Sequence, residues 1–132
     1  MAALFGFVAL GCNGGKLHEA RSLARALEQF SHAAPVDRPR ALAGLEAVFV
    51  TDATVIAAKT ECVTYARKLH EALTLKDEVA VRVGDVRAGL IDKSDPIAIT
   101  LPTKLDAAER SLKEAVVIHA ECRRLLAAAE AR

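Results

Sequence analysis

The feature that most constrains this chain is a seven-residue repeat that runs through two long segments. In each segment mainly apolar side chains recur at alternating steps of four and three residues, an average spacing of 3.5 residues. The first segment carries Cys62, Ala66, Leu69, Leu73, Lys76, Ala80, Val83, Arg87 and Leu90 at these positions, and the second carries Leu105, Ala108, Leu112, Ala115, His119, Cys122, Leu126 and Ala129. Two helices with such repeats bury them against each other. The repeat therefore predicts a long helical hairpin.

Residues 89–96 separate the two segments and have the composition of a helix end followed by a helix start. Gly89 suits the end of the first helix, Ser94 is the expected N-cap of the second, and Pro96 suits its first turn. Pro102 either kinks the second helix or marks its true beginning. The short connection favours antiparallel neighbours.

One stretch admits a second interpretation. Residues 78–83 alternate with a period of two, which is also typical of a β-strand, and residues 97–100 would be its partner in a hairpin. We favour helix, because the seven-residue repeat continues in phase through the same stretch.

Two further helices are expected before the hairpin. The first has one apolar stripe formed by Leu17, Ala20, Leu23, Leu27 and Phe30, and the second has a shorter stripe formed by Ala41, Leu42, Leu45 and Val48. Pro35 and Pro39 bracket the linker between them. The β-branched run that starts at Val48 predicts a break near residues 49–53, where Thr51 or Asp52 can cap the next helix.

These patterns together predict an all-α fold. The architecture is an elongated antiparallel helical hairpin with one or two shorter helices packed on it, a three- to four-helix bundle that forms a single domain over residues 17–132. Hydrophobic residues make up 52% of the chain and aromatic residues only 4%, which suits alanine-rich packed helices.

An uncharged apolar run occupies residues 2–10 and is too short to span a bilayer, which takes about 20 residues. It has the length of the apolar core of a secretory signal. The stretch Ala9-Leu10-Gly11-Cys12 resembles the lipobox of bacterial lipoproteins. Gly11 matches the small residue before the cleavage point and Cys12 matches the lipid-bearing cysteine. Ala9 and Leu10 match loosely, and the usual basic start of a signal is absent between Met1 and the run.

The resemblance implies a cellular location and a lipid anchor. Residues 1–11 would be a signal-peptide-like segment that is removed, Cys12 would carry the acyl chains, and residues 12–16 would form a flexible tether. The protein would then be anchored in the bacterial cell envelope and face the periplasm. Asn13, in place of Asp, favours the outer membrane. The alternative is a short buried helix in which Cys12 is an ordinary core residue.

If Cys12 carries lipid, two cysteines remain, and an even number in an exported protein suggests a disulfide. In an antiparallel hairpin, the numbers of facing residues have a constant sum. Cys62 and Cys122 are equidistant from Asp92, which lies inside the predicted turn. We therefore expect these two cysteines to face each other with Cα atoms within about 7 Å. The alternative is two separate buried thiols.

Sequence motifs of catalysis are missing. The four histidines show no metal-ligand spacing, and neither a nucleophile elbow nor a phosphate-binding loop is present. We therefore expect no enzyme activity, no metal and no cofactor. Eighteen basic and seventeen acidic residues give a net charge of +1, so the charge favours no nucleic-acid partner.

Three functions fit these observations. The first is a small exported, lipid-anchored helical module that binds another envelope protein through an uncovered apolar stripe near Val79–Leu90. The second is a periplasmic bundle that senses a ligand in a pocket lined by Tyr65 and His119. The third is a cytosolic helical adaptor in which residues 2–12 belong to the core.

Overall fold

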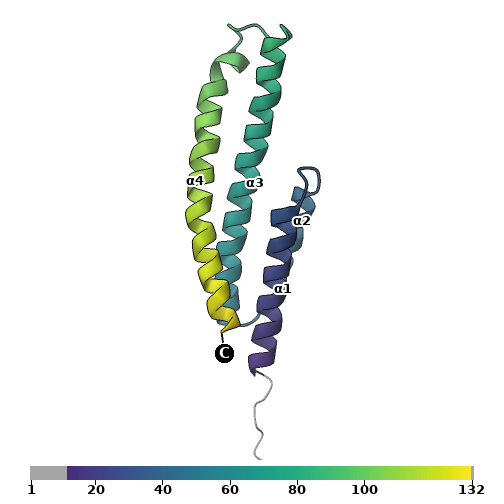
Figure 1. Ribbon diagram of the computed structural model, residues 1–132, viewed down its shortest axis with the longest axis vertical. Coiled ribbons are helices and arrows are strands. Elements are labelled where there is room, and N and C mark those ends of the chain that lie inside the picture. The colour runs from purple at the N-terminus through teal and green to yellow at the C-terminus, as the bar shows by residue number, and fades with distance from the viewer. Residues whose placement is uncertain (1–11, 132) are drawn as a thin grey trace, which may run out of the picture.

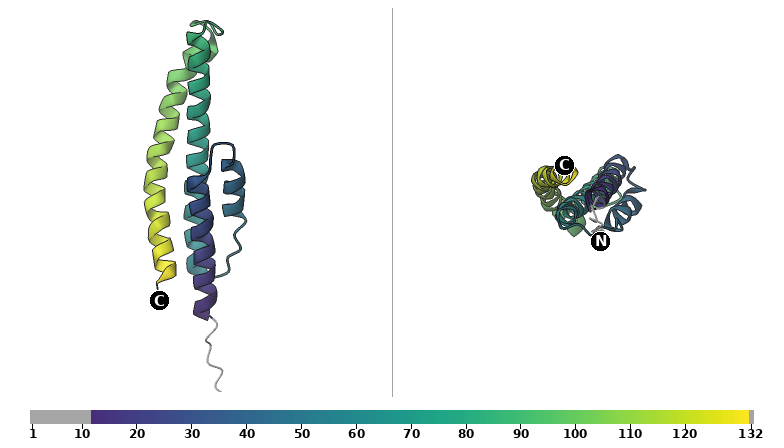
Figure 2. Two further views of the ribbon diagram at one scale, coloured as in Figure 1. Left: turned by 45° about the vertical axis from the view of Figure 1, so that its right-hand side comes forward. Right: turned by 90° about the horizontal axis from the view of Figure 1, so that it is seen from below.

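The computed structural model describes residues 12–131, which form four α-helices (Figure 1). Their bounds are Cys12–His32 for α1, Arg38–Glu46 for α2, Ala53–Arg87 for α3 and Pro96–Glu130 for α4. α3 and α4 lie side by side and make the most extensive contact in the described chain. α1 and α2 cover only the half of this hairpin that is farther from its turn (Figure 2). The predicted all-α fold, a long antiparallel hairpin with two shorter helices, is confirmed.

Both stretches with a strand-like pattern are helical. Residues 78–83 belong to α3 and residues 97–100 belong to α4. Val79 and Val83 stand one turn apart and are buried and half-buried, whereas Val81 between them is 63% exposed, so the alternation also fits a helix with one buried side. The preference for helix is therefore confirmed.

The end of α3 is fixed by a glycine in the left-handed conformation. Gly89 has a φ of +76°, which only glycine adopts at no steric cost. The N–H of Leu90 donates to the carbonyl of Asp85 at 2.9 Å, and the N–H of Gly89 donates to that of Val86 at 3.1 Å. This pair of bonds is a Schellman motif, which satisfies the last carbonyls of the helix.

The start of α4 differs by one residue from the prediction. Asp95, and not Ser94, is the N-cap, and its carboxylate accepts a hydrogen bond from the N–H of Ile97 at 2.8 Å. Pro96 occupies the first turn as predicted, so the residue directly before it has the cap geometry. The Ser94 hydroxyl instead donates to Asp92 at 2.6 Å and closes the loop.

Pro102 lies inside α4 rather than at its beginning. A proline removes one backbone donor and crowds the preceding turn, which bends a helix without always ending it. Pro102 is exposed, and α4 is visibly bowed (Figure 2). The helix therefore starts at Pro96, as the constant-sum register of the hairpin requires.

The core is concentrated where all four helices meet. Buried side chains from α1, α2, α3 and α4 form one cluster around Ala20, Leu23, Leu27, Phe30, Leu45, Val55, Ala58, Cys62, Val63, Tyr65, Ala66, Ala115, Cys122, Leu126 and Ala129. Nearer the turn, Ala72, Val79, Leu101 and Ala108 are buried between α3 and α4 alone, outside that cluster. The molecule thus has a four-helix half and a two-helix half.

The connection between α2 and α3 is held on α1 by one carboxylate. Glu19 Oε1 accepts hydrogen bonds from the N–H of Thr51 at 2.9 Å and from its hydroxyl at 2.6 Å, and Oε2 accepts from the N–H of Asp52 at 3.0 Å. Asp52 is also the N-cap of α3, with its carboxylate accepting from the N–H groups of Thr54 and Val55, as predicted for this break. Glu19 therefore fixes the point from which α3 starts.

The beginning of α1 corrects one prediction. Residues 12–16 were expected to form a flexible tether, but α1 begins at Cys12 and includes Gly14 and Gly15. Glycine has no side chain to oppose a helix, and the space around both glycines is open. A glycine costs about 1 kcal/mol relative to alanine in a helix, so this first turn is intrinsically the weakest of α1. The segment of residues 1–11, including Gly11, lies outside the described residues.

We predict that Glu19→Gln lowers the melting temperature at neutral pH, because an amide has only one acceptor oxygen for three donors. The hydrogen bond from the Thr51 hydroxyl, followed by those from the backbone N–H groups of Asp52 and Thr51, lowers the pKa of Glu19 below its ordinary value of 4.5. A lowered folded-state pKa gives stability that is present above pH 4.5 and is lost as the pH falls through the folded pKa. Thermal unfolding of both proteins from pH 7 to pH 3 should show the difference narrowing at acidic pH. A difference that stays constant over this range would contradict this role.

Candidate functional site

The two cysteines of the hairpin form a disulfide. Cys62 on α3 and Cys122 on α4 have an S–S distance of 2.06 Å and a Cα–Cα distance of 4.8 Å. Both residues are fully buried in the core. The predicted register, with residue 92 at the centre of the hairpin, is confirmed.

Small side chains let the two helices approach closely at the bridge. Ala58 and Ala66 flank Cys62 at one turn on either side, and Ala115 and Ala129 stand seven residues from Cys122 in either direction. All four alanines are at most 1% exposed. Their short side chains suit helices whose Cα atoms are only 4.8 Å apart at the bridge. The seven-residue repeat thus supplies a place where a disulfide fits.

The structure separates this pair from the proposed lipid site. The disulfide uses Cys62 and Cys122, so the third cysteine, Cys12, is not part of it. Cys12 is the first residue of α1, at the end of the molecule opposite the hairpin turn (Figure 1). Gly11, the proposed residue before the cleavage point, lies outside the described residues, so the lipobox interpretation stays a prediction.

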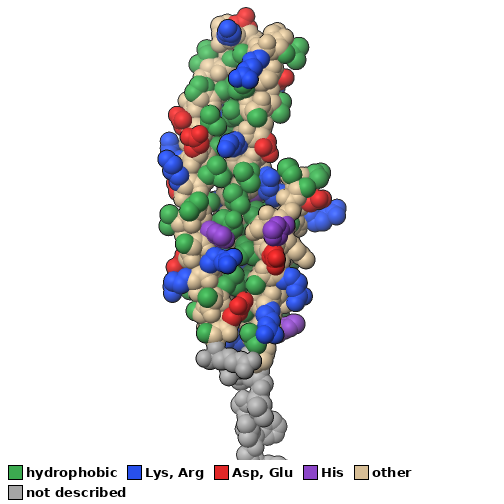
Figure 3. Space-filling model, in the orientation of Figure 1, with side chains coloured by type: hydrophobic (Ala, Val, Ile, Leu, Met, Phe, Trp, Pro, Cys, Tyr) green, Lys and Arg blue, Asp and Glu red, His purple; other side chains and the backbone are tan. Residues whose placement is uncertain are grey.

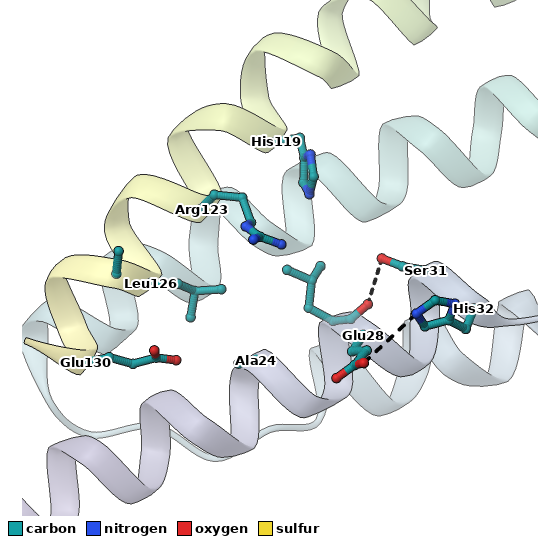
Figure 4. A pocket seen from close by; sticks show the side chains of 10 residues that line it. Ala24, Glu28, Ser31, His32, His119, Arg123, Leu126 and Glu130 are labelled. Carbon is teal, nitrogen blue, oxygen red and sulfur yellow. Dashed lines mark hydrogen bonds and ion pairs between the residues drawn. The ribbon is translucent and has the colours of Figure 1, made fainter.

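A cleft of about 480 Å³ lies between α1 and α4 (Figure 4). Its lining residues are Ala24, Leu27, Glu28, Ser31, His32, His119, Arg123, Leu126, Ala127 and Glu130. Leu27 and Leu126 are buried at its floor, and most of the charged residues at its rim are exposed. Arg123 projects from α4 across the cleft toward α1.

One aromatic contact lies at the edge of this cleft. The rings of Tyr65 and His119 are stacked with centroids 4.4 Å apart and planes 27° apart. Burial, and next the charge of Arg123, lower the pKa of His119 below its ordinary value of 6.5, which favours the neutral imidazole. Burial raises the pKa of the Tyr65 hydroxyl. Of the two residues predicted to line one ligand pocket, His119 lines this cleft and Tyr65 is not among the lining residues.

The rim of the cleft does not gather its polar groups at one point. Glu28 and His32 lie one turn apart on α1, and their side chains approach each other at 4.0 Å, while Glu130 lies at the opposite end (Figure 4). The Ser31 hydroxyl donates to the carbonyl of Leu27 at 3.0 Å, one turn earlier on α1. Within residues 12–131, no group of three or more His, Cys, Asp or Glu side chains is placed to hold a metal ion. The apolar floor and the dispersed polar rim suit an elongated, partly apolar group.

The stripe near Val79–Leu90 is only partly uncovered. Val79 is buried between α3 and α4, Val83 and Val86 are half-buried, and Leu90 at the turn is 77% exposed. A hollow of about 310 Å³ lies in this region, lined by Val83, Val86, Arg87, Lys93, Ala98 and Leu101. The exposed part of the surface is thus a groove shared by both helices, which the pattern of α3 alone did not reveal.

Among the described helices, none is long and apolar enough to cross a membrane. No family model, curated protein or solved structure matches this chain.

We predict that the double substitution Cys62→Ala/Cys122→Ala lowers the free energy of unfolding by about 4 kcal/mol, because the bridge closes a loop of 60 residues and removes entropy from the unfolded chain. Denaturant unfolding under non-reducing conditions measures the loss. The matched control is Cys12→Ser, which changes a cysteine outside the bridge and should leave the stability nearly unchanged. Thiol titration of the denatured, oxidised protein provides a second test: two reactive thiols from Cys62 and Cys122 would show that the bridge does not form.

Proposed function

We propose that this protein is a small exported, lipid-anchored helical protein of the bacterial cell envelope that acts through protein contacts. The observation that carries the proposal is the fully buried pairing of Cys62 with Cys122 in the core. Disulfides persist in oxidising compartments such as the periplasm and are rare in the cytosol. The disulfide therefore supports export from the cytosol independently of the N-terminal motif.

The N-terminal motif supports the anchor. Ala9-Leu10-Gly11-Cys12 resembles a lipobox, and the bridge leaves Cys12 as the cysteine available for acylation. Each buried CH₂ of an acyl chain contributes roughly 0.8 kcal/mol to membrane binding, so two or three chains would anchor the protein firmly. Because α1 begins at Cys12, an anchor there would leave the hairpin turn as the part farthest from the attached end.

The exposed apolar side chains of the surface support binding to another protein rather than catalysis. The described side chains include exposed valines, leucines and isoleucines in the two-helix half, at Val81, Leu90, Ile97 and Ile99. Exposed apolar side chains that gather in one region favour binding to another protein. The partner would be another envelope protein, bound at the half of the hairpin that α1 does not cover.

A second candidate function is ligand binding in the cleft between α1 and α4. Its volume of about 480 Å³ is within the range of small-molecule sites, and Arg123 and His119 offer donors above an apolar floor. Because the polar groups of the rim are dispersed, ligand binding in the cleft is less well supported than protein contact. The cytosolic alternative is disfavoured by the buried disulfide, since thiols are kept reduced in the cytosol.

We predict that Cys12→Ser moves the protein from the membrane fraction to the soluble fraction of the cell, because a serine hydroxyl cannot form the thioether that carries the lipid. Fractionation followed by immunoblotting measures the shift. The matched control is Cys62→Ser/Cys122→Ser, which makes the same exchange elsewhere and should leave the surviving protein membrane-bound. Mass spectrometry of the native protein should show loss of residues 1–11 and a gain from acyl chains. Membrane association that persists in Cys12→Ser would refute the anchor.

A further inference from the structure

The groove on the two-helix half continues the surface that α1 covers. Ala98, Leu105, Leu112, His119 and Leu126 stand seven residues apart on α4, so they share one side of that helix. The last two line the cleft with α1. Ala98 lines the hollow near the turn, together with Val83 of α3. We call the stretch formed by Ala98, Leu105, Leu112 and Val83 the open groove.

Side chains of the open groove are half-buried, and hydrophobic atoms continue along the hairpin beyond the end of α1 (Figure 3). The ion pairs between α3 and α4 lie on the other side of the contact. Lys104 pairs with Glu78 at 3.0 Å, and it is the neighbour of Leu105, from which it diverges by about 100° around the helix. Lys68 of α3 and Glu114 of α4 form a second ion pair on that side. One side of the hairpin is therefore closed by ion pairs. The other side is open and has an apolar floor, with the cationic side chains of Arg87 and Lys93 around its end near the turn.

Val116 marks the edge of the open groove. It stands seven residues before Arg123 and fourteen before Glu130, which both line the cleft, so it lies on the same side of α4 as these two residues. Val116 is 70% exposed. Val117 is 71% exposed but belongs to the side that carries Arg124, which pairs with Glu121 away from the cleft. Val116 and Val117 therefore have the same side chain and nearly the same exposure, but they point in different directions around α4.

We propose that the open groove binds a second copy of this chain, inverted, so that the two-helix halves of both copies form an antiparallel four-helix bundle. The proposal goes beyond the proposed function, because it assigns a second copy of this chain to the open groove in addition to a different envelope protein at the exposed side chains. It rests on that function only in assuming that the protein acts by contact.

The stepped shape of the molecule favours an inverted copy. α1 stands on the hairpin face and ends about halfway along it (Figure 1). In a parallel pair with these faces together, the two α1 helices would meet and hold the two open grooves apart. In an inverted pair, the two-helix half of each copy fills the space above α1 of the other. The groove is then closed along its whole length by the same apolar surface.

Exposed residues at the two ends of the groove match in this arrangement. Leu90, 77% exposed, lies in the turn between α3 and α4, and Val36, 85% exposed, lies in the loop at the upper end of α1. An inverted copy brings the turn of each molecule to the α1–α2 loop of the other, so that Leu90 approaches Val36 and Val116. A symmetric pair makes each such contact twice.

The area of the open groove and the charge of the two-helix half are also compatible with a dimer. Residues 96–113 of α4 extend for about 27 Å, and two helices are about 20 Å wide, which gives a flat area of about 540 Å² per copy. The two copies together would bury about 1,000 Å² or more, the size at which specific interfaces begin. Residues 73–113 contain seven Lys or Arg and seven Asp or Glu, so two such halves carry no net charge that would drive them apart.

Sedimentation equilibrium on the full chain carrying Cys12→Ser tests the pair without any lipid. We expect twice the monomer mass. Val116→Glu should raise the dissociation constant about tenfold or more, because the symmetric interface contains the new charge twice. Val117→Glu should leave it unchanged. Circular dichroism should show both variants folded, since both valines are exposed. A monomer at hundreds of micromolar, or equal dimerisation of the two variants, would overturn the proposal.

Cross-linking tests the direction of the pair in the same Cys12→Ser chain. The double substitution Leu90→Cys/Val116→Cys should give a covalent dimer on mild oxidation, and Leu90→Cys alone should not, since the two turns lie at opposite ends of an inverted overlap. Efficient cross-linking of Leu90→Cys alone would indicate a parallel pair and refute the inversion. Because both experiments use unlipidated protein, their failure is distinct from failure of the anchor, which fractionation reports.

Discussion

The register between α3 and α4 is the constraint on which the rest of the structure depends. It is fixed at one end by the Schellman motif at Gly89 and the capped start of α4 at Asp95. It is fixed at the other end by the bridge between Cys62 and Cys122. With both ends set, Leu101, Ala108, Ala115, Cys122 and Ala129 are buried at seven-residue spacing along α4. On α3 the buried positions shift near the turn, where Ala72 and Val79 are buried and the predicted Lys76 and Ala80 are exposed. α1 and α2 then need only to cover an existing surface.

Packing is uneven because the two short helices cover only part of that surface. The half that contains the bridge has a core from four helices, and the half near the turn buries small and medium side chains between two. Local opening is easiest where few apolar contacts are made. We therefore expect amide hydrogens of the isolated chain to exchange faster near Gly89 than near Cys62. Association with a second copy would protect the same region.

Much of the fold followed from the spacing of residues along the chain. The helix assignment of residues 78–83 and 97–100, the turn, the cap at Asp52 and the facing of the two cysteines each depend on patterns within one or two helices. The errors arose where one residue competed with another. Asp95 displaced Ser94 as cap, since the cap directly precedes Pro96, and the helix extended through Gly14 and Gly15. Glu19 was missed entirely, because its partners Thr51 and Asp52 are about 30 residues away and only the docking of α1 brings them near. The cleft depends on the same docking.

The position of the bridge also determines how this molecule would carry mechanical load. The first residue of α1 and the end of α4 both lie at the end opposite the turn (Figure 1). Tension between these two ends would pass from α3 to α4 through the sulfur atoms. The chain between the two cysteines, a separation of 60 residues, would bear none of it. A molecule pulled from its ends would thus yield first in α1, α2, the first turns of α3 and the last turns of α4, and the distal hairpin would stay unstretched until the disulfide was reduced.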